Sequence, residues 1–377
     1  STQGYSSAAS DVYKRQGQAS IFCECQAKGG KRILEYELYT GRYTGGPSGD
    51  GVCSWTFDGE VLRQGRKYGE LTDPSYVLPQ GDRLYVVEEL PDKATVACFS
   101  LDEKDGSSVL WHKEVPGAGL CHGVIAGDSL YVSGYAGGTL TGLDAASGAV
   151  TFYKEFSGNG PNALRQEKAH IHSAQPSPDG SRLLAADLGT DRLYQFVINS
   201  QTGLTPDKNQ PWFQVGPGRG PRHFAFHPNG KWLYLVTELD RSLLVFRYQD
   251  DRLDQVGEYS LRGNYDPDSS LAADIHVSPD GKFLYVSVRG PGCLQEFEIQ
   301  GEGGVLYPLG RFSTGGWCPR SFHISPDGRY VAVANQEPGT LEVFPREEKS
   351  GRLGRPLCSV DVPRVSCVKW REVLSVM

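Results

Sequence analysis

One pattern returns through this chain at intervals of about 50 residues. Its clearest copies are SAQPSPDGSRLLAADL, FAFHPNGKWLYLVTEL, IHVSPDGKFLYVSVRG and FHISPDGRYVAVANQE. Each is an apolar stretch, a Pro-Asp-Gly or Pro-Asn-Gly turn and a second apolar stretch. Two further copies, YVLPQGDRLYVVEEL and HGVIAGDSLYVSGYA, have turns that are two residues shorter. A period of this length is typical of propellers, solenoids and other repeat architectures.

The fourth residue after each turn glycine marks the period. These markers stand at positions 85, 131, 184, 234, 285 and 332, with spacings of 46, 53, 50, 51 and 47 residues. A further step of 46 residues back from Tyr85 reaches Tyr39, within the apolar stretch ILEYELYTGRYTGG. The chain therefore contains seven copies of the pattern.

Each copy has the character of β-strands, because short β-branched and aromatic runs are bounded by turn residues and long helical periodicity is absent. About 50 residues with four strands is the size of a propeller blade. A parallel β-helix would need shorter coils, and a sandwich would not repeat so regularly. We therefore predict an all-β fold, a seven-bladed β-propeller with four-stranded antiparallel blades around a central channel. The strand-like segment VSCVKW, Val365–Trp370, is expected to help close the ring beside the N-terminal part of the chain.

The sequence favours one domain. Residues 1–20 have neither periodicity nor the apolar core of a secretory signal, and we expect them to be irregular or non-native. Residues 21–377 are expected to form a single propeller. The net charge of −7 disfavours nucleic-acid binding, and no apolar run approaches the roughly 20 residues of a membrane span. The nine cysteines are scattered, which favours free thiols in a reducing compartment and a cytoplasmic location.

The segment GPRHFAFHPNGKWLYLVTEL carries opposite charges at its two ends. Arg222 stands eight residues before the turn glycine Gly230, and Glu238 stands eight residues after it. In a blade the innermost strand runs along the channel and the second strand returns antiparallel to it. Both side chains are therefore expected on the face opposite the turn.

Corresponding positions in the other blades also carry polar groups. The positions eight before the turn glycine are His172, Arg222, Ala273 and Arg320 in the full-length copies, and the positions eight after it are Glu89, Tyr135, Leu188, Glu238, Arg289 and Gln336. We match His122 of the third copy to the neighbourhood of His223. Because the blades converge on one channel mouth, this set predicts a site for a small anionic ligand. The alternative is that these charges lie in solvent or pair between blades.

Other motifs carry less information. His170 and His172 alternate on a strand as zinc ligands can, but no nearby carboxylate completes a site, so metal binding is disfavoured. The segment GPGRGP lacks the strand, helix and lysine of a phosphate-binding loop. No G-x-S-x-G elbow is present, which disfavours a serine hydrolase.

Several of these motifs together resemble the seven-bladed lactonase family, which includes the propeller-type 6-phosphogluconolactonases and the carboxy-cis,cis-muconate cyclases. They are YTGRYTGG, DPSYVLPQGDRLYVVEEL, HSAQPSPDG, GPRHFAFHPNGKWLYLVTEL, VSPDGKFLYVSVRG and CVKW. The resemblance extends from about residue 33 onward. It implies His172, Arg222, Glu238 and Arg289 as the catalytic residues. Around Tyr135, VSGYAGG departs from the family's pattern.

The resemblance implies hydrolysis of a sugar lactone, most specifically 6-phosphoglucono-1,5-lactone to 6-phosphogluconate in the pentose phosphate pathway, without a metal or other cofactor. Arg222 or Arg289 would stabilise the oxyanion, and His172 or Glu238 would transfer protons, with the acid and base roles left open. Substrate contacts are expected from Arg320, His122, His223, Glu89, Tyr135 and Gln336. Three alternatives remain: a muconate-type cycloisomerase, a non-catalytic propeller that binds a partner, and a metal-dependent sugar lactonase on a six-bladed propeller.

Overall fold

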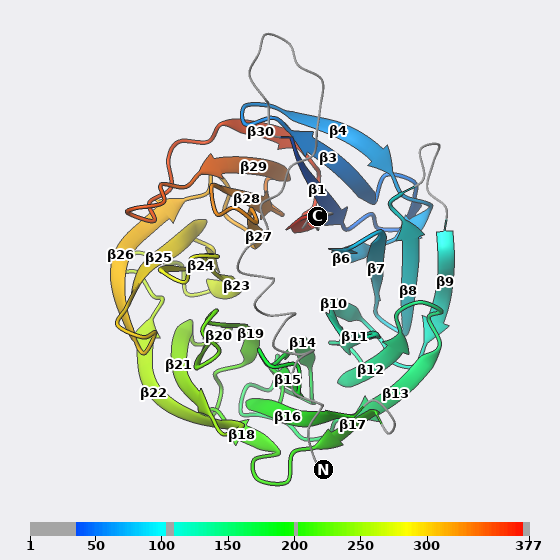
Figure 1. Ribbon diagram of the computed structural model, residues 1–377, viewed down its shortest axis with the longest axis vertical. Coiled ribbons are helices and arrows are strands. Elements are labelled where there is room, and N and C mark those ends of the chain that lie inside the picture. Colours follow the sequence, from blue (N-terminus) through cyan, green and yellow to red (C-terminus); the bar gives the residue numbers. More distant parts are fainter. Residues whose placement is uncertain (1–34, 103–108, 200–202, 372–377) are drawn as a thin grey trace, which may run out of the picture.

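Seven radial sheets surround a central axis in the computed structural model of the protein (Figure 1). The structure describes residues 35–102, 109–199 and 203–371. All the secondary-structure elements named in these ranges are β-strands. This confirms the predicted seven-bladed β-propeller. The predicted boundary near residue 20 lies outside the described residues.

The first blade joins the two ends of the described chain. Its strands, from the axis outward, are β31 (Val365–Trp370), β1 (Tyr36–Arg42), β3 (Val52–Phe57) and β4 (Leu62–Lys67). Leu38 of β1 pairs with Trp370 of β31. The expected closure of the ring by the C-terminal strand is therefore confirmed. A short ribbon, β2 (Pro47–Ser48) with β5 (Leu71–Thr72), lies beside this blade.

The other six blades follow in chain order, each beginning with its innermost strand. The second comprises β6 (Pro74–Gln80), β7 (Arg83–Leu90), β8 (Lys93–Ser100) and β9 (Val109–Val115). The third comprises β10 (Leu120–Ala126), β11 (Ser129–Gly134), β12 (Thr139–Asp144) and β13 (Val150–Glu155). The fourth comprises β14 (Ile171–Pro176), β15 (Arg182–Asp187), β16 (Arg192–Asn199), β17 (Gly203–Pro206) and β18 (Trp212–Gln214).

The last three blades are regular. The fifth comprises β19 (Pro221–Phe226), β20 (Trp232–Thr237), β21 (Ser242–Gln249) and β22 (Arg252–Ser260). The sixth comprises β23 (Leu271–Val277), β24 (Phe283–Arg289), β25 (Cys293–Gln300) and β26 (Val305–Ser313). The seventh comprises β27 (Pro319–Ile324), β28 (Tyr330–Asn335), β29 (Thr340–Pro345) and β30 (Cys358–Asp361). Only the fourth blade departs from the predicted four strands, since β17 and β18 both pair with β16.

The backbone conformation of the hairpin turns explains why glycine recurs at these positions. Gly180, Gly230, Gly281 and Gly328 have φ between 71° and 75°, in the left-handed region that glycine adopts without steric cost. The Asp or Asn before each glycine accepts a hydrogen bond from the backbone N–H two residues on, as Asn229 does from Lys231 at 3.0 Å. These turns fix the register of the inner two strands of each full-length copy.

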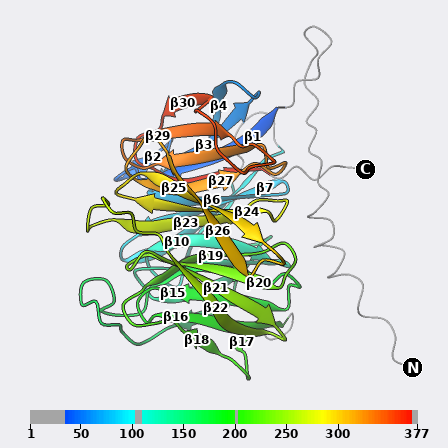
Figure 2. The same cartoon turned by 90° about the vertical axis from the view of Figure 1, so that its left-hand side faces the viewer.

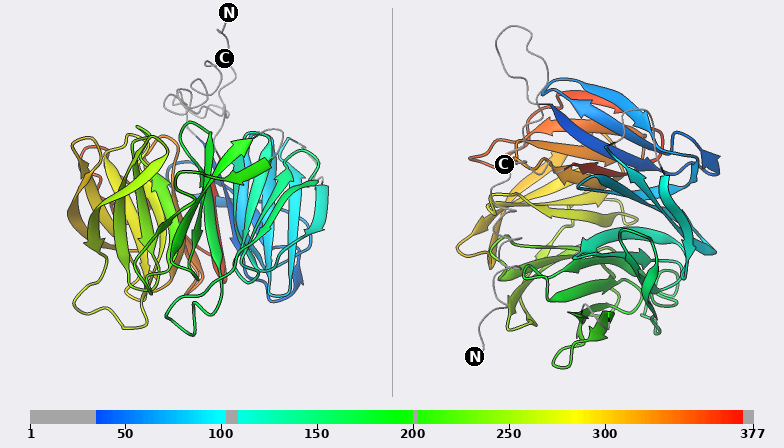
Figure 3. Two further views of the ribbon diagram at one scale, coloured as in Figure 1. Left: turned by 90° about the horizontal axis from the view of Figure 1, so that it is seen from below. Right: turned by 45° about the vertical axis from the view of Figure 1, so that its right-hand side comes forward.

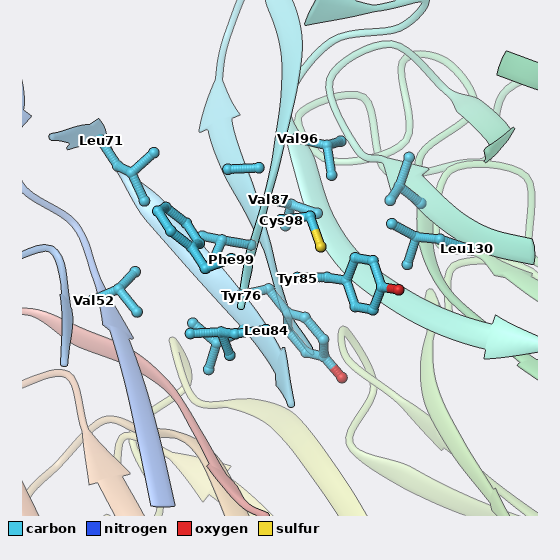
Figure 4. Packing of buried hydrophobic residues seen from close by; sticks show 14 of the residues in the cluster. Val52, Leu71, Tyr76, Leu84, Tyr85, Val87, Val96, Cys98, Phe99 and Leu130 are labelled. Carbon is cyan, nitrogen blue, oxygen red and sulfur yellow. The ribbon is translucent and has the colours of Figure 1, made fainter. Parts of the chain in front are cut away.

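The hydrophobic core lies between the blades. Both faces of the inner strands are buried, which is why these strands read as nearly continuous apolar runs. Figure 4 shows one cluster, in which Val52 of the first blade and Leu130 of the third lie on opposite sides of the second blade, around Leu84 and Val87. Because each sheet is packed against both neighbours, the ring positions its channel-facing residues rigidly.

Seen from the side, the molecule is a disc whose connecting loops emerge on two opposite faces (Figures 2 and 3). The hairpin turns between the two inner strands of each blade lie on one face. The loops that enter the inner strands, and the ends of the second strands, lie on the other. We call this second face the entry face.

Candidate functional site

A β-bulge interrupts the innermost strand of every blade near its entry-face end. In the pairing of β19 with β20, for example, Pro221 pairs with Thr237 and His223 with Val236, so that Arg222 is the extra residue. The extra residues around the ring are Ser75, Cys121, His172, Arg222, Arg320 and Ser366, and in the sixth blade Ala273 and Asp274 together stand opposite Ser287. Bulges commonly redirect a side chain next to an active site.

The bulge residues converge on a pocket at the channel mouth. Its lining is Ser75, Tyr76, Glu89, Cys121, His172, Arg222, His223, Arg320, Ser321 and Ser366. The lining thus contains the bulge residue of six of the seven blades. Because the same position of the repeat recurs in each blade, segments far apart in the chain build one site. His172, Arg222 and Arg320 are brought together, as the period predicted.

Glu238 is the electrostatic centre of this site. Its carboxylate accepts hydrogen bonds from Arg222 Nε at 2.7 Å and from Arg165 Nη2 at 2.5 Å, and it forms an ion pair with Arg289 Nη2 at 3.0 Å. His172 Nε2 lies 3.7 Å from the same carboxylate. Glu238 is only 2% exposed, so these charges interact with little solvent screening. The predicted placement of Arg222 and Glu238 on one face is therefore observed.

These contacts set the protonation of the site. Burial by itself would raise the pKa of the Glu238 carboxyl, but Arg289, Arg222, His172 and Arg165 together hold it well below its usual range. Burial lowers the pKa of Arg289 to about 10, against the opposing effect of Glu238. Burial, reinforced by Arg222, also holds the pKa of His172 well below its usual range. At neutral pH the site therefore combines an ionised Glu238, charged arginines and a neutral His172.

A second group of charges lies across the pocket. Tyr43 donates a hydrogen bond from its hydroxyl to Glu89 Oε2 at 2.6 Å, and the Arg320 guanidinium lies 5.4 Å from the centre of the Tyr43 ring. Arg320 Nη2 approaches Glu89 Oε2 only to 4.0 Å. Within the described ranges, Arg320 donates no hydrogen bond to another side chain or to the backbone. Arg320 lines the pocket, where its donors are available to a ligand.

The remaining predicted residues surround the pocket without lining it. Tyr135 accepts a hydrogen bond from Arg165 at 3.2 Å and stacks on His170 at 4.3 Å between ring centres. His122 occupies in β10 the register position that His223 occupies in β19, as we matched them, and its ring lies 5.4 Å from that of His223. Gln336 follows β28, and its buried Oε1 has no hydrogen-bond partner in the described part of the chain. Direct substrate contact by Tyr135, His122 and Gln336 stays a prediction.

The sequence reasoning missed several residues of the site, among them Tyr43, Arg165, Asp274 and five residues of the pocket lining, Ser75, Tyr76, Cys121, Ser321 and Ser366. Tyr43 stands four residues after the first-blade marker Tyr39, just as Glu238 stands four residues after the fifth-blade marker Tyr234. Extending the register by one blade would therefore have found Tyr43. Arg165 lies in the loop between β13 and β14, outside the repeat, and no signal in the sequence pointed to it. It reaches Glu238 only because this loop enters the fourth blade on the entry face.

Metal ligation has no support from the side chains that the structure describes. His170 Nδ1 bonds to the Tyr135 carbonyl at 2.8 Å, while His172 faces the pocket. Within residues 35–102, 109–199 and 203–371, no group of three or more His, Cys, Asp and Glu side chains is arranged to hold a metal ion. The same ranges contain no apolar helix of membrane-spanning length.

Comparison with known proteins agrees with the architecture. Residues 37–370 match the sequence model described as "Lactonase, 7-bladed beta-propeller". The chain belongs to this lactonase family. It is therefore an enzyme of the lactone-hydrolase class.

Members of the lactonase family resemble the chain over nearly its whole length. A 6-phosphogluconolactonase of Bacillus subtilis is 31% identical over 351 residues, which cover 90% of this chain and 99% of the relative. A Bacteroides fragilis protein described as a candidate 6-phosphogluconolactonase has a crystal structure with a TM-score of 0.82 at 31% identity, covering 89% of this chain and 98% of that one. The periplasmic gluconolactonase of Pseudomonas aeruginosa gives a TM-score of 0.82 at 28% identity, covering 90% and 99%.

Proposed function

We propose that this lactonase hydrolyses a phosphorylated sugar lactone, most specifically 6-phosphoglucono-1,5-lactone to 6-phosphogluconate. The observation that carries the proposal is the pocket at the channel mouth, where the guanidinium groups of Arg222 and Arg320 stand beside neutral His172. The site as a whole sets four arginines, at positions 165, 222, 289 and 320, against the carboxylates of Glu89 and Glu238. This excess of positive charge suits an anionic substrate.

Arg320 is the best placed group for the substrate's phosphate. Arg165, Arg222 and Arg289 already share the Glu238 carboxylate, whereas Arg320 makes no hydrogen bond among the described residues. A planar guanidinium with free donors can bind a phosphate through two parallel charge-assisted hydrogen bonds. The names of the B. subtilis and B. fragilis relatives support a phosphorylated substrate.

Arg222 is the best placed group for the oxyanion. It lines the pocket, and its Nε and Nη1 are held by Glu238 and by the Ala273 carbonyl at 2.7 Å each. Its remaining nitrogen, Nη2, is left to stabilise the negative charge that develops on the lactone carbonyl oxygen. Fixed donors of this kind give one of the largest rate effects in acyl transfer. Arg289 does not line the pocket and, in this proposal, holds Glu238 in place.

Proton transfer falls to a histidine of the pocket. Glu238 is a poor base because three arginines stabilise its ionised form. The role that we propose for Glu238 is therefore to align Arg222 and to balance its charge. We therefore propose histidine, and not Glu238, as the group that transfers protons.

The test is a direct assay of the purified enzyme. We expect hydrolysis of 6-phosphoglucono-1,5-lactone well above its spontaneous rate, unchanged by a chelator. Glucono-1,5-lactone is the second candidate substrate, since the P. aeruginosa relative is named a gluconolactonase. A cis,cis-muconate-type dicarboxylic acid should not be cyclised. Rates equal to the spontaneous rate with both lactones would contradict the proposal, and turnover of the muconate would favour the cycloisomerase alternative.

The compartment stays a prediction. The seven cysteines of the described ranges are all free, five of them buried, which is the state that a reducing compartment maintains. The P. aeruginosa relative, by its name, is periplasmic. We propose the cytoplasm for this enzyme, and cell fractionation of the native protein tests it.

A further inference from the structure

The pocket contains a second histidine whose surroundings differ from those of His172. His223 follows the bulge residue Arg222 in β19 and also lines the pocket. Its Nδ1 lies 2.8 Å from Asp274 Oδ1, and its Nε2 is buried with no hydrogen-bond partner in the described structure. A buried ring nitrogen without a partner, at the wall of a pocket, is a position for a group of the substrate or for its attacking water.

Asp274 is held as a carboxylate by donors from three blades. Besides His223 of the fifth blade, it accepts hydrogen bonds from the backbone N–H groups of Ile275 at 3.0 Å in the sixth and Phe322 at 3.2 Å in the seventh. His276 Nε2 approaches its other oxygen at 3.3 Å. Burial would raise the pKa of Asp274, but His276 and His223 hold it well below its usual range.

An ionised Asp274 determines the tautomer of His223. The carboxylate can only accept a hydrogen bond, so His223 carries its proton on Nδ1. Nε2 is then an unprotonated acceptor on a ring that lines the pocket. Burial, with Arg222 beside it, lowers the pKa of His223 to about 4, so the ring is neutral and able to accept a proton at physiological pH. The other charged or titratable groups around it are His122, His172 and Lys369.

Among the described residues, His172 has no hydrogen-bond partner that fixes its tautomer in the way that Asp274 fixes that of His223. Its Nε2 lies 3.7 Å from Glu238 and its Nδ1 lies 3.8 Å from Cys121 Sγ. Both ring nitrogens therefore face polar groups of the protein. Of the two pocket histidines, His223 alone combines a fixed tautomer with an unoccupied acceptor.

We propose that His223 is the general base of the lactonase and that Asp274 is the positioning residue that fixes its tautomer. The inference rests on the proposed lactone hydrolysis. His223 Nε2 takes a proton from water as the water oxygen forms a bond to the lactone carbonyl carbon, and the carbonyl oxygen becomes an oxyanion at Arg222. When the tetrahedral intermediate collapses, the ring C–O bond breaks and the leaving oxygen takes the proton back from Nε2. The products are the hydroxy acid, ionised by loss of its proton to solvent, and the regenerated histidine.

Charge development explains how a histidine with a depressed pKa can act as this base. Arg222 and burial disfavour the imidazolium in the free enzyme. The oxyanion forms on the lactone carbonyl oxygen beside Arg222. Its negative charge offsets the positive charge of Arg222 at the moment when His223 receives the proton. Asp274 stabilises the imidazolium from the other side. The proton transfer therefore becomes favourable only in the transition state, which is where stabilisation accelerates a reaction.

The kinetic test compares His223→Gln, Asp274→Asn and the control His227→Gln in the full chain. His227 lies in the hairpin turn of the same blade on the opposite face, where its Nε2 meets the Gly281 carbonyl at 2.9 Å. We expect kcat for the lactone to fall on the order of 10²–10⁴-fold in His223→Gln. Asp274→Asn should lower kcat with little change in KM, and the control should match the wild type. A folded His223→Gln enzyme with kcat within threefold of the wild type would overturn the inference.

A second measurement does not depend on activity. Selective ¹⁵N-histidine labelling of the wild type, with His223 assigned by comparison with His223→Gln, reports which ring nitrogen carries the proton. We expect protonated Nδ1 and unprotonated Nε2 at pH 7, and a changed pattern in Asp274→Asn. A protonated Nε2 in the wild type would overturn the inference. A wild type inactive on every lactone would instead overturn the proposed function, and the base assignment with it.

Discussion

At the scale of single residues, the site is a balance of buried charges. Glu238 faces Arg165, Arg222 and Arg289, and the last two would be costly to bury without it. Arg320 has only a 4.0 Å approach to Glu89. The first three arginines therefore have positions set by the protein, and the fourth has donors left for the substrate. This difference predicts different results when each charge is removed.

Removal of the Arg320 charge should affect phosphate recognition alone. In Arg320→Ala we expect KM for 6-phosphoglucono-1,5-lactone to rise roughly 10–100-fold, because a charge-assisted hydrogen bond contributes about 1.5–3 kcal/mol. KM for unphosphorylated gluconolactone should stay unchanged. Arg329→Ala, in the exposed hairpin turn of the same blade, is the matched control. Equal effects on both lactones would place the phosphate elsewhere.

Neutralisation of Glu238 should misalign the arginines around it. Glu238→Gln keeps the shape of the side chain, but it leaves Arg222 without its counter-charge, and a displacement of about 1 Å can cost 10²-fold in rate. We expect kcat/KM for the lactone to fall by about that factor. Stability should fall by about 3–5 kcal/mol, as for the loss of one partner of a buried ion pair, measured by denaturant unfolding. Glu302→Gln, whose partner Lys231 is exposed, should change neither quantity.

At the scale of elements, the ring depends on one strand from the far end of the chain. β31 is the innermost strand of the blade that β1, β3 and β4 complete. Trp370, at its end, is buried against Tyr36 and Phe57, with ring centres 5.9 and 6.0 Å away. Its indole N–H donates to the His323 carbonyl in the seventh blade at 3.0 Å. Trp370 therefore joins the last blade to the first.

Truncation of Trp370 should open this closure. We expect Trp370→Ala to lower the free energy of unfolding by about 3–5 kcal/mol, the usual cost of removing a large buried aromatic side chain. Equilibrium denaturation measures it. Trp317→Ala is the control, because Trp317 is 57% exposed. Equal stabilities of the two variants would mean that the closing strand contributes little to the ring.

At the scale of the whole molecule, four histidines of the innermost strands share one electrostatic property, and they are His122, His172, His223 and His323. Burial is the first cause that holds the pKa values of His122, His172 and His323 well below the usual range and that of His223 at about 4. These rings stay neutral in the folded protein but become charged in the unfolded chain below about pH 6.5. Folding is thus coupled to proton release from several histidines at once.

The melting temperature should therefore fall on mild acidification. A depressed pKa contributes stability above the unfolded value near 6.5, and that stability is lost as the pH falls toward the folded value. Each such histidine contributes a slope of about 1.4 kcal/mol per pH unit in this range. We expect a decrease in melting temperature from pH 7 to pH 5, and a smaller decrease in His323→Gln. A melting temperature that is constant over this range would contradict the coupling.

The sequence alone determined the blade count, the closing strand and the shared face of Arg222 and Glu238. It could do so because the turn glycines and the two-residue period of a strand are local properties that repeat along the chain. The first-blade Tyr43 was within reach of the same register. The sequence could not predict that a bulge in each innermost strand directs side chains into the pocket. A bulge can be recognised only once the pairing of the two strands is known.

Only the tertiary structure decided which side chains meet across blades. Arg165 reaches Glu238 from a loop outside the repeat, and Asp274 meets His223 across the boundary between the fifth and sixth blades. In the sequence Asp274 is simply the neighbour of Ala273, the position where the polar pattern fails. The packing of neighbouring sheets sets these contacts, and no local pattern encodes it. The repeat thus specified the frame of the site, and the arrangement of the blades specified its chemistry.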